Sequence, residues 1–553
     1  LTALAGASNS KVSRRAMLGT VAGAIGGLAV GSVVGWLART PEAAPATTIT
    51  QTVTRAQTIT QPIVTTQTVT VTGTATPPVG LPERFDGVEV AVMTQPWNMC
   101  PVKHHRVKWE EMTGGKIRMI EFPYAELRPK AMDDFLAKAG TYDILIFPGG
   151  LMGDYAGGGH LENLDPWIQR YGFPALEDIL PACRKVAEWA GHLYAVPYDG
   201  DCHILYYRKD VLTDPEYQRR FKNEYGYPLP VPPKTWEEVR DVAKFFNGWD
   251  WDKERPGETK YGIAFIAKRG TQAQWTILDL IAQYNVIPGK PSRYAGHMFF
   301  DPVTMEPLMN TPGAIAALEM LLELKNYAPP GLLGYGFAEF RDAYVKGGVA
   351  VLGIDWGDVG IMEWMDPGSV VKGKLGYAPL PGATRVWDRQ HGRWINKYNQ
   401  NDYGDFGGWV MGISTYSKKK EAAFHLLRFL NDPAQSILDA TGTIGCWGSN
   451  PYRYSHFDLE KWVAVGFGED SAREYLSVIE RILSNPLHLI DLKIPGRDEY
   501  YDKLDAHLAN AFIGAETPEE AMRAVYEEWE QVTDSLGRER QKRLYIESLG
   551  IKV

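Results

Sequence analysis

Blocks of apolar and polar residues alternate along most of the chain, which predicts a body built from alternating strands and helices. Residues 88–93, 142–147 and 261–266 are short, mostly apolar runs of the length expected for buried strands. The run 142–147 leads into Pro148-Gly149-Gly150, which indicates that this strand ends in a loop. We therefore expect a globular body that begins near residue 85.

Two helix starts are marked by local signals. Thr235 lies three residues before Glu238, the spacing of a capping box. Pro312 opens a stretch with helical periodicity, and proline is favoured in the first turn of a helix. Strands that alternate with helices favour parallel sheets covered by helices, and ligands bind beyond the carboxyl ends of such strands.

The first eighty residues show a different pattern. Residues 16–38 contain no charged side chain and follow three basic residues, as in an export signal or a membrane anchor. The run is long enough to span a bilayer, which takes about 20 residues. Residues 13–18 look like a twin-arginine signal, and residues 15–18 also resemble the pilin-type cleavage site of some archaeal surface proteins. We expect residues 1–40 to be a signal peptide or membrane anchor.

A threonine-rich stretch follows. Residues 47–76 hold 14 threonines, no aromatic residue and a single charged residue, Arg55. This composition cannot bury a core, and threonine-rich tracts with proline commonly form extended, O-glycosylated stalks. We expect residues 41–84 to be a disordered Thr/Pro-rich stalk.

Charge and composition exclude several classes of protein. The formal charge of -9 and the pI near 5.8 argue against a nucleic-acid-binding protein, which usually shows a basic stripe. Hydrophobic residues make up 44% and charged residues 23%, which is typical of a globular protein. A single long apolar run excludes a polytopic membrane protein.

Cysteine is scarce. Cys100, Cys183, Cys202 and Cys446 are too few for a disulfide scaffold. An exported protein permits disulfides, and four cysteines allow three full pairings. The sequence does not choose among these pairings or between them and buried free thiols.

Catalytic motifs are mostly missing. The chain lacks His-Glu-x-x-His, Gly-x-Ser-x-Gly and Cys-x-x-Cys. Residues 368–375 nearly match a phosphate-binding loop, but Leu375 replaces the hydroxyl residue that would hold Mg²⁺, so we interpret them as a turn. His104 and His105 lack a third ligand, and we expect a surface pair. We expect no catalytic residue, no metal and no cofactor.

The order and spacing of a set of consecutive segments indicate a particular protein family. These segments are 142–147, 191–198, 205–210, 234–238, 344–351 with Trp356, 375–381, 407–414, 417–430, and 517–522 with Trp529. Over roughly residues 85–540 the chain resembles family 1 extracellular solute-binding proteins, the ligand receptors of sugar-type ABC importers. The signal-like segment and the stalk fit a tethered receptor of that kind.

The resemblance implies an α/β fold of the type II periplasmic-binding-protein class, with two discontinuous lobes joined by a hinge around a central cleft. The implied segments are 85–202 and 407–455 for the first lobe, 203–375 and 470–545 for the second, and 376–406 and 456–469 for the crossovers. The implied function is capture of a sugar, oligosaccharide or polyol and its delivery to the membrane subunits of an ABC permease. We expect a monomeric body outside the cytoplasm, tethered to the membrane by the N-terminal segment.

Ligand positions transfer residue by residue. Asp201 falls on a carboxylate near the hinge, and Trp356, Trp275 and Tyr501 fall on cleft aromatics. Tyr155 falls beside the first-lobe cleft loop. The family's first-lobe carboxylate after residues 144–147 is replaced here by Gly149-Gly150.

Four further candidates follow from residue type and position. Asp154 could substitute for the missing carboxylate, and Asp199 could accept ligand hydroxyls beside Asp201. Trp97 and Trp409 lie in or near predicted loops or strand ends, where apolar ring faces suit the C–H faces of sugars. Core packing is the competing interpretation for each tryptophan, and a turn or cap is the competing interpretation for Asp199 and Asp201.

Two other function classes stay open at this point. A surface structural protein or adhesin would explain the pilin-like segment and the stalk. A glycoside hydrolase could use Asp199 and Asp201 as a pair of carboxylates.

Overall fold

The computed structural model describes residues 80–403 and 408–551. The predicted signal or anchor at 1–40 and nearly all of the predicted stalk at 41–84 lie outside these residues. Within 80–403 and 408–551, no helix combines the length and the apolar character needed to cross a bilayer.

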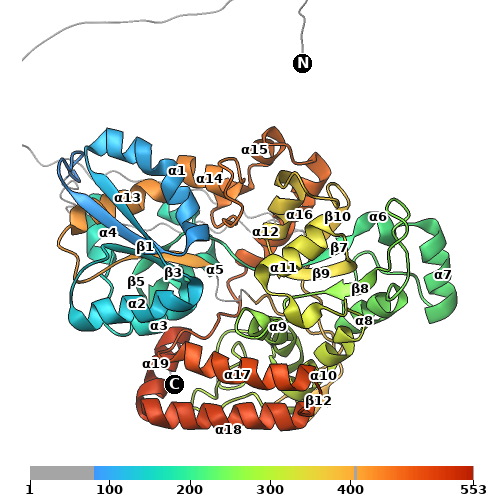
Figure 1. Cartoon of the computed structure of the whole chain (residues 1–553). Coiled ribbons are helices and arrows are strands. Elements are labelled where there is room, and N and C mark those ends of the chain that lie inside the picture. Colours follow the sequence, from blue (N-terminus) through green and yellow to red (C-terminus); the bar gives the residue numbers. More distant parts are fainter. Residues whose placement is uncertain (1–79, 404–407, 552–553) are drawn as a thin grey trace, which may run out of the picture. The chain divides into compact units, whose positions relative to one another are not determined.

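A five-stranded sheet forms one side of the body (Figure 1). Its order is β2-β1-β3-β13-β6, with β1 parallel to β2 and β3, and β13 antiparallel to β3 and β6. Its strands are β1 (Glu89–Thr94), β2 (Lys116–Glu121), β3 (Ile144–Pro148), β6 (Ala195–Pro197) and β13 (Trp409–Ile413). Strands β1 and β3 confirm the two strands predicted over 88–93 and 142–147.

Helices cover this sheet on both faces (Figure 1). They are α1 (Pro96–Thr113), α2 (Tyr124–Ala137), α3 (Met152–Tyr155), α4 (Asp165–Tyr171), α5 (Pro181–Ala187), α13 (Lys420–Leu430) and α14 (Pro433–Ala440). A two-stranded ribbon, β4 (Glu188–Trp189) and β5 (His192–Leu193), precedes β6.

A four-stranded sheet forms the second side. Its strands are β7 (His203–Arg208), β8 (Tyr261–Ala264), β9 (Ala350–Trp356) and β10 (Leu375–Pro379), in the order β10-β7-β9-β8. Strand β8 is parallel to β9, and β7 is antiparallel to both of its neighbours. Strand β7 is buried on both faces: Ile204 and Tyr206 enter one hydrophobic cluster, and Leu205 and Tyr207 enter the other.

The helices around this sheet include the predicted starts. Thr235 forms the capping box of α8 with Glu238, and Thr311 caps α10, which begins at Pro312. The helices are α6 (Lys209–Leu212), α7 (Pro215–Tyr225), α8 (Trp236–Phe245), α9 (Ala273–Asn285), α10 (Pro312–Lys325), α11 (Phe337–Arg341), α12 (Asp358–Met365), α15 (Leu459–Ala464), α16 (Glu469–Leu483), α17 (Arg497–Phe512), α18 (Pro518–Leu536) and α19 (Arg538–Leu549).

The sheets are mixed, which corrects the prediction of parallel sheets. The chain passes from β6 to β7 over residues 198–202 and from β10 to β13 over residues 380–408. Strands next to such a crossing enter the second sheet without a helical return, so nothing requires them to run parallel. The later crossing contains a hairpin of β11 (Val386–Asp388) and β12 (Arg393–Ile395). The lobe boundaries given above stay a prediction.

Candidate functional site

Three of the rings assigned to a cleft lie in mutual contact. Trp356 is the last residue of β9, Trp275 lies in the first turn of α9, and Tyr501 lies in α17. The ring centroids of Trp275 are 5.7 Å from Trp356 and 6.3 Å from Tyr501, both edge-on. All three side chains are buried.

A carboxylate joins the polar ends of these rings. Asp491 accepts hydrogen bonds from the hydroxyls of Tyr501 and Tyr403 and from Nε1 of Trp275, the last at 3.4 Å. It also pairs with Arg497, whose Nη2 lies 3.1 Å from Oδ2. We call Trp275, Trp356, Tyr501, Asp491 and Arg497 the ring cluster. Burial, with the nearby charge of Asp491, raises the pKa of Tyr501 well above its ordinary value.

Asp491 and Arg497 are not among the site residues predicted from the sequence. Arg497 stands four residues before Tyr501. A basic residue one helical turn before a predicted cleft aromatic was therefore the signal that could have identified it. Asp491 lies in an irregular segment and belongs to no motif. Its role becomes visible only because four donors converge on it in the fold.

The two assigned hinge aspartates form a separate group. The backbone N–H of Asn450 donates to Asp199 at 2.5 Å, and the Asn450 side-chain amide donates to Asp201 at 2.9 Å and to Asp358 at 2.7 Å. We call Asp199, Asp201, Asp358 and Asn450 the acid cluster. Arg341 pairs with Asp358 from the far side, with Nη2 2.6 Å from Oδ2.

Burial dominates the electrostatics of the acid cluster. It raises the pKa of Asp199 and of Asp201, and the neighbouring carboxylate of Asp358 raises both further. The amide nitrogen of Asn450 has only two hydrogens for its carboxylate neighbours. Protonated carboxyl groups therefore fit this arrangement, because they can donate to one another.

The acid cluster lies next to the ring cluster along β7. Asp201 stands two residues before His203, the first residue of β7, which is the register partner of Trp356. The imidazole of His203 lies 4.1 Å from the Trp356 ring centroid. The two clusters therefore occupy adjoining strand ends of the four-stranded sheet.

The remaining candidates lie on the side of the five-stranded sheet. Tyr155 is fully buried and packs against Phe135 and Phe147, as a core side chain does. Asp154 pairs with Arg128 at 2.7 Å and borders a pocket of about 350 Å³. The structure thus places Asp154 at a cavity and Tyr155 inside the core.

Two tryptophans face partners near the boundary between the sheets. Trp409, the first residue of β13, meets Tyr124 edge-on at 6.1 Å. Trp97, in the first turn of α1, is 39% exposed and meets Phe337 of α11 edge-on at 5.6 Å.

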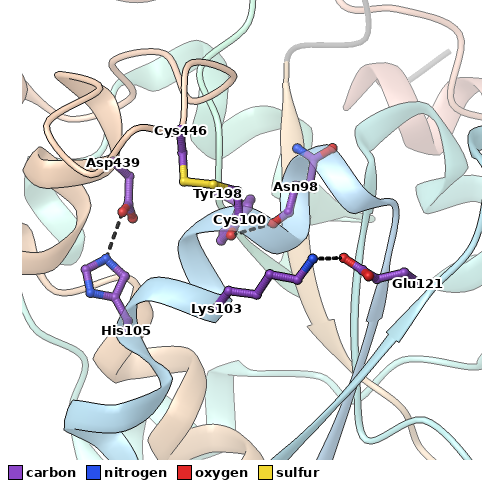
Figure 2. Close-up of a disulfide and its surroundings, with 8 residues drawn as sticks. All are labelled: Asn98, Cys100, Lys103, His105, Glu121, Tyr198, Asp439 and Cys446. Atoms are coloured by element: carbon purple, nitrogen blue, oxygen red, sulfur yellow. Dashed lines mark hydrogen bonds and ion pairs between the residues drawn. A yellow bond between two sulfur atoms is a disulfide. The ribbon is translucent and has the colours of Figure 1, made fainter. Parts of the chain in front are cut away.

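A disulfide joins Cys100 in α1 to Cys446, a pairing that the sequence could not choose (Figure 2). Cys446 opens the loop that carries Asn450 into the acid cluster. A Cβ atom on Gly448 would lie 1.5 Å from Nε1 of Trp97, so this loop packs tightly on α1. The bridge thus braces the loop that supplies Asn450. Cys183 is a buried free thiol, and Cys202 is buried as well.

Figure 2 shows two further contacts of this region. The Tyr198 hydroxyl donates to the backbone oxygen of Asn98 at 2.8 Å. His105, expected on the surface, is buried, and its Nε2 lies 2.7 Å from Asp439. That expectation was wrong for His105 because the adjoining helix α14 supplies a buried carboxylate partner.

Residues 80–403 and 408–551 contain no group of three or more histidine, cysteine or acidic side chains placed to hold a metal ion. The near-match to a phosphate-binding loop, residues 368–374, forms turns and bends that lead into β10.

Comparison with known proteins identifies the family. The model of the bacterial extracellular solute-binding protein family matches residues 101–437. The chain is 26% identical over 333 residues to a probable ABC transporter-binding protein of Deinococcus radiodurans, covering 58% of this chain and 66% of that protein. It is 26% identical over 302 residues to a mannitol-binding protein of Pseudomonas aeruginosa, covering 54% and 58%. The chain thus spans about six-tenths of the length of these relatives.

Solved structures show the same fold. An ABC transporter solute-binding protein of Agrobacterium radiobacter K84, in complex with ribitol, superposes with a TM-score of 0.63 at 22% identity, covering 81% of this chain and all of that one. A maltose-bound protein of T. maritima gives 0.60 at 21% identity, with coverage of 81% and 100%. The body is therefore a mixed α/β fold of the type II periplasmic-binding-protein kind. By the family match, the chain belongs to the bacterial extracellular solute-binding proteins.

Proposed function

We propose that the protein is the extracytoplasmic receptor of an ABC importer, which captures a sugar, oligosaccharide or polyol and presents it to the permease. Membership of the solute-binding family is the observation that carries this proposal. Relatives named for mannitol and maltotriose, and similar folds solved with ribitol and maltose, support the chemical class. The same matches favour a receptor over an adhesin or a glycoside hydrolase.

The ring cluster and the acid cluster support a carbohydrate site between the two sheets. Aromatic faces suit the C–H faces of sugars, and carboxylates accept hydroxyl hydrogens. Trp356, Tyr501 and Asp201 are the proposed principal contacts. Trp275, Asp199, Trp97, Trp409 and Asp154 are proposed with them, in the positions described above, whereas Tyr155 packs in the core.

Calorimetric titration tests the proposed site. Mannitol, ribitol, glucose, maltose and maltotriose are the probes, each with the purified body. Trp356→Ala should weaken the binding of the preferred probe by about thirtyfold, because truncating a ring in a desolvated site typically costs about 2 kcal/mol. Trp462→Ala, which removes a fully buried ring in another part of the fold, serves as the control.

The two variants separate binding from packing. The control should lower the melting temperature and leave affinity per folded molecule unchanged. Equal affinity in Trp356→Ala and wild type would show that the ring cluster is core, and absence of binding to every probe would contradict the sugar or polyol class.

We also propose that residues 1–40 export the protein and that the segment 41–84 tethers the body to the outer face of the membrane. Their composition carries this proposal. Limited proteolysis of the unglycosylated protein should cut within residues 41–80 and release an intact body. Resistance of that segment to protease would contradict an extended stalk.

A further inference from the structure

Arg497 occupies an unusual position for a charged side chain. It begins α17 and is 2% exposed. Its guanidinium carbon lies 4.6 Å from the ring centroid of Tyr501 and 5.4 Å from that of Trp275. Asp491 and Asp498 hold it in place through Nη2 and Nη1, at 3.1 Å and 2.8 Å. The guanidinium therefore covers two of the rings proposed as stacking platforms.

The opposite side of Arg497 faces the turn that follows β3. A Cβ atom on Gly150 would lie 2.3 Å from Nε, 2.7 Å from Cζ and 2.8 Å from Cδ of Arg497. Only a residue without a side chain lets the arginine lie here. The Gly149-Gly150 pair, which stands where the resembling family has a carboxylate, thus leaves room that an arginine from α17 fills.

One donor of Arg497 is left over. Nε is buried and has no hydrogen-bond partner among the described residues. A buried donor without an acceptor is destabilising, so an acceptor that reached this nitrogen would stabilise the buried arginine. Hydroxyl oxygens of a ligand in the neighbouring site are acceptors of the right kind.

We infer that Arg497 sets the size of the ligand, so that the site takes a single-unit polyol or monosaccharide and excludes an oligosaccharide. The inference rests on the proposed function. A further sugar ring stacked on Tyr501 or Trp275 would have to displace a guanidinium from two carboxylates and from Gly150. A small ligand confined to the ring of Trp356 needs no such displacement, because the guanidinium lies over Trp275 and Tyr501.

The test compares ligands of increasing length by calorimetric titration. Mannitol, ribitol and glucose represent single units, and maltotriose represents a chain of three. Wild type should bind at least one single-unit probe tenfold or more tightly than maltotriose. Arg497→Met should reduce that preference at least tenfold, because it removes the ion pairs that keep this side chain over Tyr501 and Trp275.

Companion variants keep the test decisive if Arg497→Met folds poorly. Asp491→Asn/Arg497→Met removes both charges of the buried pair and should reduce the preference in the same way. Arg208→Met, which removes a buried arginine from its ion pairs with Asp210 and Asp252, is the matched control and should keep the wild-type preference.

Gly150→Ala tests the contact from the other side. Its methyl group would press on the guanidinium, so we expect binding of the preferred probe to weaken at least tenfold. Gly334→Ala is the control, because its added Cβ would meet open space. Wild-type binding by Gly150→Ala would overturn the inferred contact.

The outcomes separate this inference from the proposed function. If wild type binds maltotriose as tightly as the single units, or if both Arg497 variants keep the wild-type preference, size selection by Arg497 is wrong and the receptor function stands. If no probe binds at all, the inference and the proposed function fall together.

Discussion

The ring cluster and the acid cluster both contain buried aspartates, but the partners of these aspartates differ. In the ring cluster, Asp491 meets a cation, Arg497, and three neutral donors. In the acid cluster, three carboxylates converge on the single amide of Asn450, and burial raises the pKa of Asp199 and Asp201. Arg341 pairs with Asp358 in the acid cluster, but Asp199 and Asp201 have no such ion pair among the described residues, and burial favours their protonated forms.

The largest effect should follow from breaking the ring cluster. Asp491→Ala leaves Arg497 buried with only the half-exposed Asp498 as a partner. We expect a loss of about 3–5 kcal/mol in the free energy of unfolding, the usual cost of removing one partner of a buried ion pair. Chemical denaturation measures it, and a loss below about 1 kcal/mol would show that the pair is dispensable.

The next effect concerns the covalent brace of the acid cluster. Reduction of Cys100–Cys446 should lower stability by about 2–5 kcal/mol, because the bridge closes a loop of 346 residues. Melting curves with and without reductant measure this loss. The Cys100→Ser/Cys446→Ser variant is the control: reductant should not change its melting temperature, and a wild type equally insensitive to reductant would contradict the bridge.

A smaller effect should appear on changing pH. A carboxyl group whose folded-state pKa is raised stabilises the fold below its unfolded pKa, about 4, and that stability is lost as pH rises toward the folded pKa. Asp199 and Asp201 should therefore lower stability between pH 5 and pH 8, by about 1.4 kcal/mol for each pH unit over which one extra proton is lost. Denaturation at both pH values should show this loss in wild type.

The Asp199→Asn/Asp201→Asn variant isolates the two aspartates from other titrating groups. Its loss of stability between pH 5 and pH 8 should be smaller than that of wild type. An identical loss in both proteins would mean that the acid cluster does not hold extra protons.

The smallest effect is expected for Asp199→Asn alone. An asparagine has one acceptor and one donor end, as a protonated carboxyl has, so it can still accept from the Asn450 backbone. We expect a change below about 1 kcal/mol at neutral pH, measured by denaturation beside Asp491→Ala. A loss as large as that of Asp491→Ala would show that the two clusters are alike.

Much of the fold could be predicted because its signals are local. The strands β1 and β3 and the caps of α8 and α10 depend on a few neighbouring residues, and the structure confirms them. The mixed sheets could not be predicted, because strand direction depends on where the chain crosses between sheets.

The candidate site divides in the same way. The family resemblance assigned Trp356, Trp275 and Tyr501 to the cleft, and in the structure Trp275 contacts both of the other rings. Asp491 and Arg497 were not predicted, because a buried ion pair depends on which residues are neighbours in the fold. It leaves no periodic pattern in the sequence. The partner of Cys100 lies 346 residues away for the same reason.

Strand β13 has a consequence for how the protein is made. The ribosome delivers β3 and β6 long before residues 409–413, which fill the gap between them. Until β13 is synthesised, two strand edges face each other unpaired, and open edges readily recruit other chains. A truncated chain that ends before Trp409 should therefore be prone to aggregate. Such a chain would need chaperones or proteases as well as lacking the complete five-stranded sheet.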